Sequence, residues 1–189
     1  MKNGIAIVGL NGSGKSTLAH ALAKELGFFE IDVEDYYFPA QKSSRQAALE
    51  EDFTESRNLS VLPFSSPRSK DEAGRAILDD LNSHPDFILS GVDLNWDEEI
   101  RSRLKIVFWL KTPAEERMKR IESREKSRWG LRVAPGGDMY ENQSEFRKSV
   151  GNRPESKVSG SLEKLACQVI DLDGTLSVAE NVRIIKKFL

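Results

Sequence analysis

The amino-acid sequence predicts a three-layer α/β domain in which helices flank a five-stranded parallel sheet. Two observations carry this prediction. Short apolar runs alternate with amphipathic helical patterns along most of the chain, and this alternation is typical of βαβ units that build a parallel sheet. In addition, the first apolar run leads into the glycine-rich segment GLNGSGKST at residues 9–17, which is typical of a tight passage from a strand into a helix.

The predicted elements follow one another in a regular order. Short apolar runs of the kind found in buried strands occupy residues 5–8, 28–33, 87–89, 104–110 and 167–170. Apolar residues at helical spacing predict helices over residues 15–26, 69–83, 139–150 and 155–166, a basic helix that begins at 113 and a last helix after 177. Because such sheets bind ligands outside the carboxyl ends of their strands, we expect the functional residues there.

Capping boxes, in which a serine or threonine precedes a glutamate by three residues, support three of these helix starts. They are expected at Ser69, Thr112 and Ser177. Proline at the position after Thr112 is also favoured in the first turn of a helix.

Composition limits the classes of function. The net charge of −2 over 189 residues gives no general attraction to nucleic acid or to an anionic membrane. Cys167 is the one cysteine, which fits a reducing compartment. No apolar run approaches the ~18 residues of a membrane span, and residues 1–4 show no signal peptide. We therefore expect a single domain over residues 1–189 that works in the cytoplasm.

Within the segment at residues 9–17, residues 9–16 match the phosphate-binding or P-loop pattern G-x-x-x-x-G-K-S. Glycine permits positive φ and close backbone approach, so that N–H groups and a helix N-terminus face the phosphates. Lys15 is expected to reach the β- and γ-phosphates, and Ser16 to bind Mg²⁺. The residues expected to hold the nucleotide in this segment are Gly9, Asn11, Gly12, Ser13, Gly14, Lys15, Ser16 and Thr17.

With this motif in its strand-and-helix context, the chain resembles the P-loop NTPases, and among them the small kinases related to adenylate kinase. The resemblance implies the P-loop NTPase fold with ATP and Mg²⁺ bound. It also implies transfer of the γ-phosphate to a small acceptor, a nucleoside or nucleoside monophosphate. No Asn-Lys-x-Asp segment, the guanine-reading motif of switch proteins, is present. By the same resemblance Gly174, which follows the last predicted strand, would line the adenine pocket.

An acid-rich segment, EIDVEDYYF at residues 30–38, ends the second predicted strand. Carboxylates beside a phosphate-binding loop can accept a proton from an attacking hydroxyl or hold Mg²⁺. The segment is similar to the turn after the second strand in uridine kinases and shikimate kinases. That likeness makes Asp32 and Asp35 the candidates for the base and metal roles, in either assignment. A solvated acidic turn is the structural alternative.

The third predicted strand departs from the family pattern. P-loop enzymes commonly end this strand with an acidic residue that orients Mg²⁺, whereas this chain has Ser90. Either Asp93, close downstream, or Asp32 could supply the missing carboxylate.

The segment from Arg117 to Arg132 holds seven basic and two acidic residues. Arg120, Arg124 and Arg128 are four apart and share a helical face. By resemblance, residues 117–138 form a basic helical lid whose arginines neutralise the transferring phosphoryl group, with glycines after the helix as hinges. A solvated basic face and a nucleic-acid surface are the alternatives.

Residues 39–67 interrupt the strand–helix alternation at the place where nucleotide kinases bind their acceptor. Arginines in or beside this insertion could hold an acceptor phosphate; they are Arg45, Arg57 and Arg68. Two other functions remain open. Ser90 favours a slow regulatory ATPase that acts through a partner, and the basic helix could serve a kinase of polynucleotide 5′ ends. The sequence leaves the acceptor and the oligomeric state open.

Overall fold

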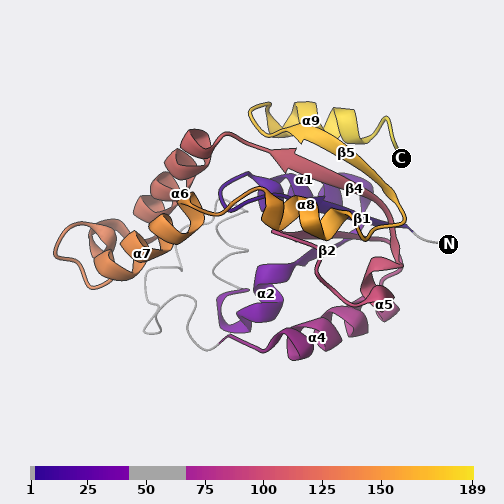
Figure 1. The fold of residues 1–189 in the computed structure, drawn as a ribbon, viewed down its shortest axis with the longest axis horizontal. Coiled ribbons are helices and arrows are strands. Elements are labelled where there is room, and N and C mark those ends of the chain that lie inside the picture. Colours follow the sequence, from indigo (N-terminus) through magenta and orange to yellow (C-terminus); the bar gives the residue numbers. More distant parts are fainter. Residues whose placement is uncertain (1–2, 43–66) are drawn as a thin grey trace.

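The computed structural model describes residues 3–42 and 67–189, and it confirms the predicted α/β architecture (Figure 1). One parallel sheet has the strand order β2-β3-β1-β4-β5. The strands are β1 (Gly4–Val8), β2 (Phe29–Asp32), β3 (Phe87–Gly91), β4 (Leu104–Lys111) and β5 (Gln168–Asp173). Because all neighbouring pairs are parallel, the carboxyl ends of the strands meet at one edge of the sheet.

Helices cover both faces of the sheet. They are α1 (Lys15–Leu26), α2 (Val33–Tyr37), α4 (Lys70–Ser83), α5 (Glu98–Arg101), α6 (Ala114–Trp129), α7 (Tyr140–Gly151), α8 (Ser156–Leu162) and α9 (Val178–Ile185). Alternate residues of β1 point to opposite faces, so Ile5 and Ile7 pack with α1 and α9, while Ala6 and Val8 pack with α2, α4 and α8. None of the helices described is both long and apolar enough to span a bilayer.

The capping predictions have different outcomes. Ser69 and Ser177 each form both hydrogen bonds of a capping box, with Glu72 and Glu180. The capping box expected at Thr112 is wrong, because α6 begins after Pro113 with no side-chain cap. The Thr112 hydroxyl instead donates to the Ser13 carbonyl oxygen at 3.1 Å. The Thr112 hydroxyl, which would have capped α6, is therefore used in a tertiary hydrogen bond to the P-loop.

Two short helices, α2 and α5, were not predicted. The second strand was expected to continue through Val33, but it ends at Asp32. The Asp32 carboxylate accepts the N–H of Glu34 at 2.9 Å and so starts α2. An aspartate at the N-cap satisfies a backbone donor at the start of a helix, which is why the chain turns into a helix at this point.

The segment predicted as a lid forms part of a helical hairpin. Helices α6 and α7 extend away from the sheet at the left of Figure 1 and are joined by the 3-10 turn η3 (Gly130–Val133) and residues 134–139. Between the two helices the buried Glu125 carboxylate accepts from Arg147 at 2.5 Å. The insertion predicted over 39–67 lies mostly outside the described residues, and so do Arg45 and Arg57.

Glu125 is expected to make the stability of the protein fall as pH rises. Burial raises the pKa of its carboxyl above the usual range, and Arg147 offsets this only in part. A carboxyl whose folded-state pKa is raised contributes stability below its unfolded pKa of about 4.3, and this contribution is lost as pH rises through the folded value. In urea unfolding across that window, Glu125→Gln should therefore gain free energy of unfolding relative to wild type as pH rises. Glu141→Gln in α7 is the exposed control, and a relative loss in Glu125→Gln would contradict the prediction.

Candidate active site

The glycine-rich segment joins β1 to α1 at the carboxyl edge of the sheet. Gly12 and Gly14 have φ values of +79° and +96°, in the left-handed region that favours glycine. A Cβ on Gly9 would lie 2.7 Å from the Leu110 carbonyl oxygen, so only glycine fits there. Gly14, at the start of α1, makes no side-chain cap. The helix N-terminus therefore directly follows the glycine turn, as the phosphate-binding pattern requires.

Two carbonyl oxygens of this loop, those of Asn11 and Ser13, accept hydrogen bonds from side chains outside the loop. Arg117 in α6 donates to the Asn11 carbonyl oxygen at 3.1 Å. The Ser13 carbonyl oxygen accepts from Arg120 at 3.0 Å and from Thr112 at 3.1 Å. These contacts fix the loop, because its carbonyl oxygens accept from α6 and from Thr112, which lies between β4 and α6. The residues present thus fit a nucleotide phosphate chain, since the backbone is held in the conformation that the phosphate-binding pattern requires.

The residues predicted to contact phosphate and Mg²⁺ begin the helix. Lys15, the first residue of α1, is only 5% exposed. Ser16 is half-buried and Thr17 is exposed. Within the described residues no group of three His, Cys, Asp or Glu side chains could hold a metal. Mg²⁺ would instead rely on Ser16, one carboxylate, and phosphate and water oxygens, which is its usual mode of binding with nucleotides.

Asp32 lies beside Ser90, at the position where an acidic residue was expected. The two residues are register partners in β2 and β3. The Ser90 hydroxyl donates to the Asp32 carboxylate at 3.0 Å, and Asp32 is 2% exposed. Asp93 is directed elsewhere, since its carboxylate accepts the N–H of Asn95 and lies 3.6 Å from Lys157 in α8. Of the two alternatives left open by the sequence, the geometry favours Asp32.

Helix α2 places Asp35 near the same end of β2, where it is also buried. The adjacent Tyr36 anchors this helix through its hydroxyl, which donates to Asp80 of α4 at 2.5 Å. Burial, together with the Asp80 carboxylate, raises the pKa of Tyr36 well above its usual value, so this donor stays protonated at physiological pH. The acid-rich segment is thus a fixed, packed structure rather than a solvated turn.

The three predicted lid arginines lie in different environments along α6. The guanidinium of Arg120 donates to Glu116, to the Ser13 carbonyl oxygen and to the Gly174 carbonyl oxygen, at distances of 2.9, 3.0 and 3.0 Å. Arg124 is exposed and Arg128 is half-buried. Arg120 therefore links the P-loop to the turn after β5. That these arginines contact a transferring phosphoryl group stays a prediction.

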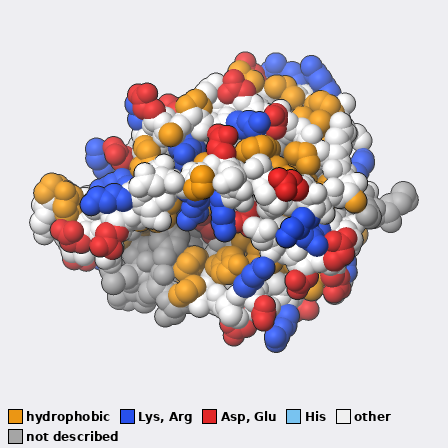
Figure 2. Space-filling model, in the orientation of Figure 1, with side chains coloured by type: hydrophobic (Ala, Val, Ile, Leu, Met, Phe, Trp, Pro, Cys, Tyr) orange, Lys and Arg blue, Asp and Glu red, His pale blue; other side chains and the backbone are white. Residues whose placement is uncertain are grey.

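The charged surface bears on the nucleic-acid alternative. On the face that Figure 2 shows, lysine and arginine side chains are interspersed with aspartate and glutamate. Several basic residues of α6 are paired within the helix, for example Lys119 with Glu115 and Arg120 with Glu116. This pattern gives no support to a continuous basic track for a polynucleotide.

Gly174 follows β5 and packs directly on Thr112. Its N–H donates to the Lys111 carbonyl oxygen at 2.7 Å. A Cβ at this position would lie 1.8 Å from the Thr112 hydroxyl oxygen, so close packing requires glycine. The adenine-pocket role suggested by resemblance stays a prediction.

Replacing Gly174 with alanine is expected to lower the free energy of unfolding by about 1–3 kcal/mol, the usual cost of overpacking. Gly160 of α8 is the matched control, because nothing lies within 4 Å of a Cβ there. Gly160→Ala should raise stability by roughly 0.5–1 kcal/mol, since alanine favours the helix. Chemical denaturation measures both, and equal stability of Gly174→Ala and wild type would show that Thr112 can move aside freely.

Sequence reasoning missed the residues that hold the P-loop from a distance. Arg153 donates to the Asn11 side-chain oxygen at 2.7 Å, across 142 residues of sequence. Arg117 was included only in a count of basic residues, and Thr112 was assigned to a helix cap. No local pattern distinguishes these side chains from ordinary surface groups, because their partners are set by the tertiary fold.

Comparison with known proteins gives a family and a fold. A family model described as an AAA domain matches residues 5–148. An uncharacterized protein of Bacillus subtilis (strain 168), YqaC, is 27% identical over 190 residues, covering 96% of this chain and 94% of that protein.

Two crystal structures share the architecture. A sugar kinase from Janibacter sp. HTCC2649 has a TM-score of 0.53 at 16% identity, with 99% of this chain and 94% of that chain covered. An uncharacterized protein from Eubacterium ventriosum ATCC 27560 has a TM-score of 0.51 at 20% identity, with 100% and 98% covered. At these identities the likeness shows a common fold.

Proposed function

The chain belongs to the AAA-domain family, and from that premise we propose that it is an ATP-dependent kinase of a small molecule. The reaction moves the γ-phosphoryl group of ATP to an acceptor hydroxyl. The observation that carries this proposal is Asp32, a buried carboxylate beside Ser90 at the same edge of the sheet as the P-loop. The Janibacter structure with a similar fold is a sugar kinase, which supports the same class of reaction.

The chain's own groups account for each requirement of the transfer. The N–H groups at the start of α1 and the Lys15 ammonium would bind the phosphates. Mg²⁺, held through Ser16 and a carboxylate, would neutralise phosphate charge. As the new bond from acceptor oxygen to γ-phosphorus forms and the bond to the β-phosphate oxygen breaks, Asp32 or Asp35 takes the hydroxyl proton. Arg120, Arg124 and Arg128 would stabilise the transferring group when the α6–α7 hairpin closes.

The buried carboxylates favour a hydroxyl acceptor. A phosphate acceptor is already ionised and needs no base, whereas a hydroxyl gains from a carboxylate that takes its proton. Among hydroxyl acceptors we propose a nucleoside first, in line with the resemblance to nucleoside kinases. If the acceptor is instead a nucleoside monophosphate, the protein is still a kinase, but Asp32 and Asp35 then have no role as a base.

The deciding experiment measures ADP formation from Mg-ATP across nucleosides, nucleoside monophosphates, sugars and other small hydroxyl metabolites. A strong rise with one acceptor is expected, and Lys15→Ala should abolish it. A slow background that no compound stimulates would contradict the kinase and favour a regulatory ATPase. Binding of a short oligonucleotide, measured at two salt concentrations, tests the alternative of a polynucleotide 5′-kinase. For such an enzyme the affinity would fall steeply as salt rises.

A further inference from the structure

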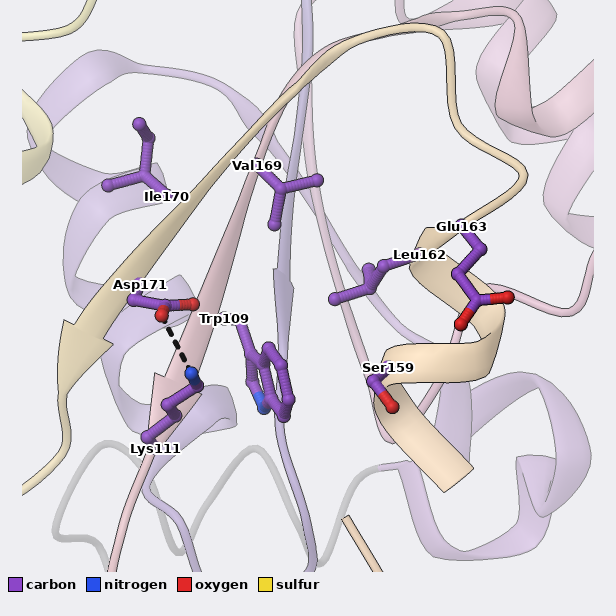
Figure 3. A pocket seen from close by; sticks show the side chains of 8 residues that line it. All are labelled: Trp109, Lys111, Ser159, Leu162, Glu163, Val169, Ile170 and Asp171. Carbon is purple, nitrogen blue, oxygen red and sulfur yellow. Dashed lines mark hydrogen bonds and ion pairs between the residues drawn. The ribbon is translucent and has the colours of Figure 1, made fainter. Parts of the chain in front are cut away.

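The cleft that continues from the P-loop has the size to take the base and ribose of a nucleotide. Its volume is about 740 Å³, within the range of small-molecule sites, about 300–1,000 Å³. Leu10 of the P-loop, the start of α6 and the turn after β5 line it. The ion pair of Lys111 and Asp171 lines both this cleft and a neighbouring groove between β5 and α8 (Figure 3). A nucleotide with its phosphates at the start of α1 can thus place its base beside the turn.

Hydrogen bonds from three other elements fix the backbone of this turn. The Gly174 N–H donates to the Lys111 carbonyl oxygen at the end of β4, and the Gly174 carbonyl oxygen accepts from Arg120 in α6. The Asp173 carbonyl oxygen accepts from the side-chain amide of Asn181 in α9 at 2.9 Å. Contacts with β4, α6 and α9 therefore set where the turn lies relative to the P-loop.

Asn181 is a polar residue on the apolar face of α9. It is 2% exposed and shares the buried face of the helix with Val182 and Ile185, which pack in the core with residues of α1. Its side-chain oxygen is buried and has no hydrogen-bond partner within the part of the chain that the structure describes. Burial of an unpaired polar atom costs free energy of folding, so an apolar side chain would suit the core better. What Asn181 adds is the hydrogen bond to the Asp173 carbonyl oxygen.

We propose that Asn181 is a positioning residue for the nucleotide base. Through the Asp173 carbonyl oxygen it holds the turn after β5 in the position from which the turn contacts the base in the cleft. Asn181 is not among the described residues that line the cleft, so it acts through the turn and not by contact with the nucleotide. The inference rests on the nucleotide site of the proposed function, but it depends neither on the acceptor nor on the transfer step.

The test measures the dissociation constants of ADP and of pyrophosphate, both with Mg²⁺, by isothermal titration calorimetry of the full chain. Pyrophosphate has the same two phosphates but no base, so it reports on the P-loop alone. Asn181→Leu keeps the branched shape of the side chain and removes its N–H donors. We expect this variant to bind ADP about fivefold more weakly, the scale of one neutral hydrogen bond, and to bind pyrophosphate with unchanged affinity.

Thermal unfolding separates positioning from packing. The Tm of Asn181→Leu should be at least that of wild type, because the variant removes a buried oxygen that has no partner among the described residues. Val182→Ala is the matched control in the same helix, since it opens a cavity in the core. It should lower Tm and leave the ratio of the two dissociation constants unchanged. If Asn181→Leu does not fold, Asn181→Ala takes its place, with the same expected change in that ratio.

Three results would overturn the proposal. The first is an unchanged ADP affinity in the variant at Asn181. The second is an equal loss of affinity for ADP and pyrophosphate, which would indicate general damage to the P-loop. The third is a wild-type protein that binds pyrophosphate as tightly as ADP, which would contradict base binding at the turn. Neither ligand requires phosphoryl transfer, so failure to find an acceptor would contradict the proposed kinase and leave this comparison intact.

Discussion

Asp32→Asn is expected to lower kcat for phosphoryl transfer about a thousandfold, within the range that a positioned base supplies. Asparagine has the same shape, and its side-chain oxygen can still accept the Glu34 N–H that starts α2. Its amide group can donate to the Ser90 hydroxyl, which accepts as readily as it donates. The variant therefore removes the negative charge while it keeps the local hydrogen bonds. Steady-state kinetics with the acceptor found in the panel measures the effect.

Matched variants at neighbouring positions separate this role from general damage. Asp93→Asn should retain nearly full activity, because that carboxylate is directed to Asn95 and Lys157. Ser90→Ala should cost much less than Asp32→Asn, since Ser90 only supports the carboxylate with one hydrogen bond. Loss of activity in Asp93→Asn with retention in Asp32→Asn would reverse the assignment.

Arg120→Ala is expected to raise KM for ATP about tenfold, to lower kcat through its proposed contact with the transferring group, and to lower Tm by several degrees. Its guanidinium links the Ser13 and Gly174 carbonyl oxygens, and hydrogen bonds to charged groups contribute about 1.5–3 kcal/mol each. Removal should loosen the P-loop against the turn after β5. Thermal unfolding reports the change in Tm, and the ATP dependence of the rate reports KM and kcat.

Arg124→Ala on the same helix is the matched comparison. Arg124 is exposed, so its removal should leave Tm unchanged and lower kcat alone through the proposed contact in the closed state. Equal Tm values for Arg120→Ala and wild type would mean that the link between P-loop and β5 turn adds nothing to stability. An unchanged kcat in Arg124→Ala would remove that arginine from the lid assignment.

The sequence predicted features that depend on neighbours in the chain. The P-loop conformation follows from glycines at required positions, and the capping boxes at Ser69 and Ser177 form because both partners lie within one helical turn. The box at Thr112 has the same local pattern. It failed because the Ser13 carbonyl oxygen, distant in sequence, is the better-placed acceptor.

The parts of the site that depend on sheet register and long-range contacts could not be predicted from the sequence. Asp32 and Asp93 were equal candidates until the pairing of β2 with β3 placed Asp32 opposite Ser90. The hydrogen bond from Arg153 to the Asn11 side chain forms only because the chain comes back to the P-loop after the α6–α7 hairpin. Local propensities contain no information on such a return.

Because the chain comes back to the P-loop directly after α7, the α6–α7 hairpin can vary in sequence independently of the P-loop. Its two ends meet at Asn11, since Arg117 lies near the start of α6 and Arg153 just after α7. Sequence between these ends can lengthen, shorten or diverge without a change in the spacing of the residues that shape the P-loop. Substitutions within residues 121–148 would therefore change how the hairpin covers the site while the contacts of Arg117 and Arg153 with the P-loop stay in place.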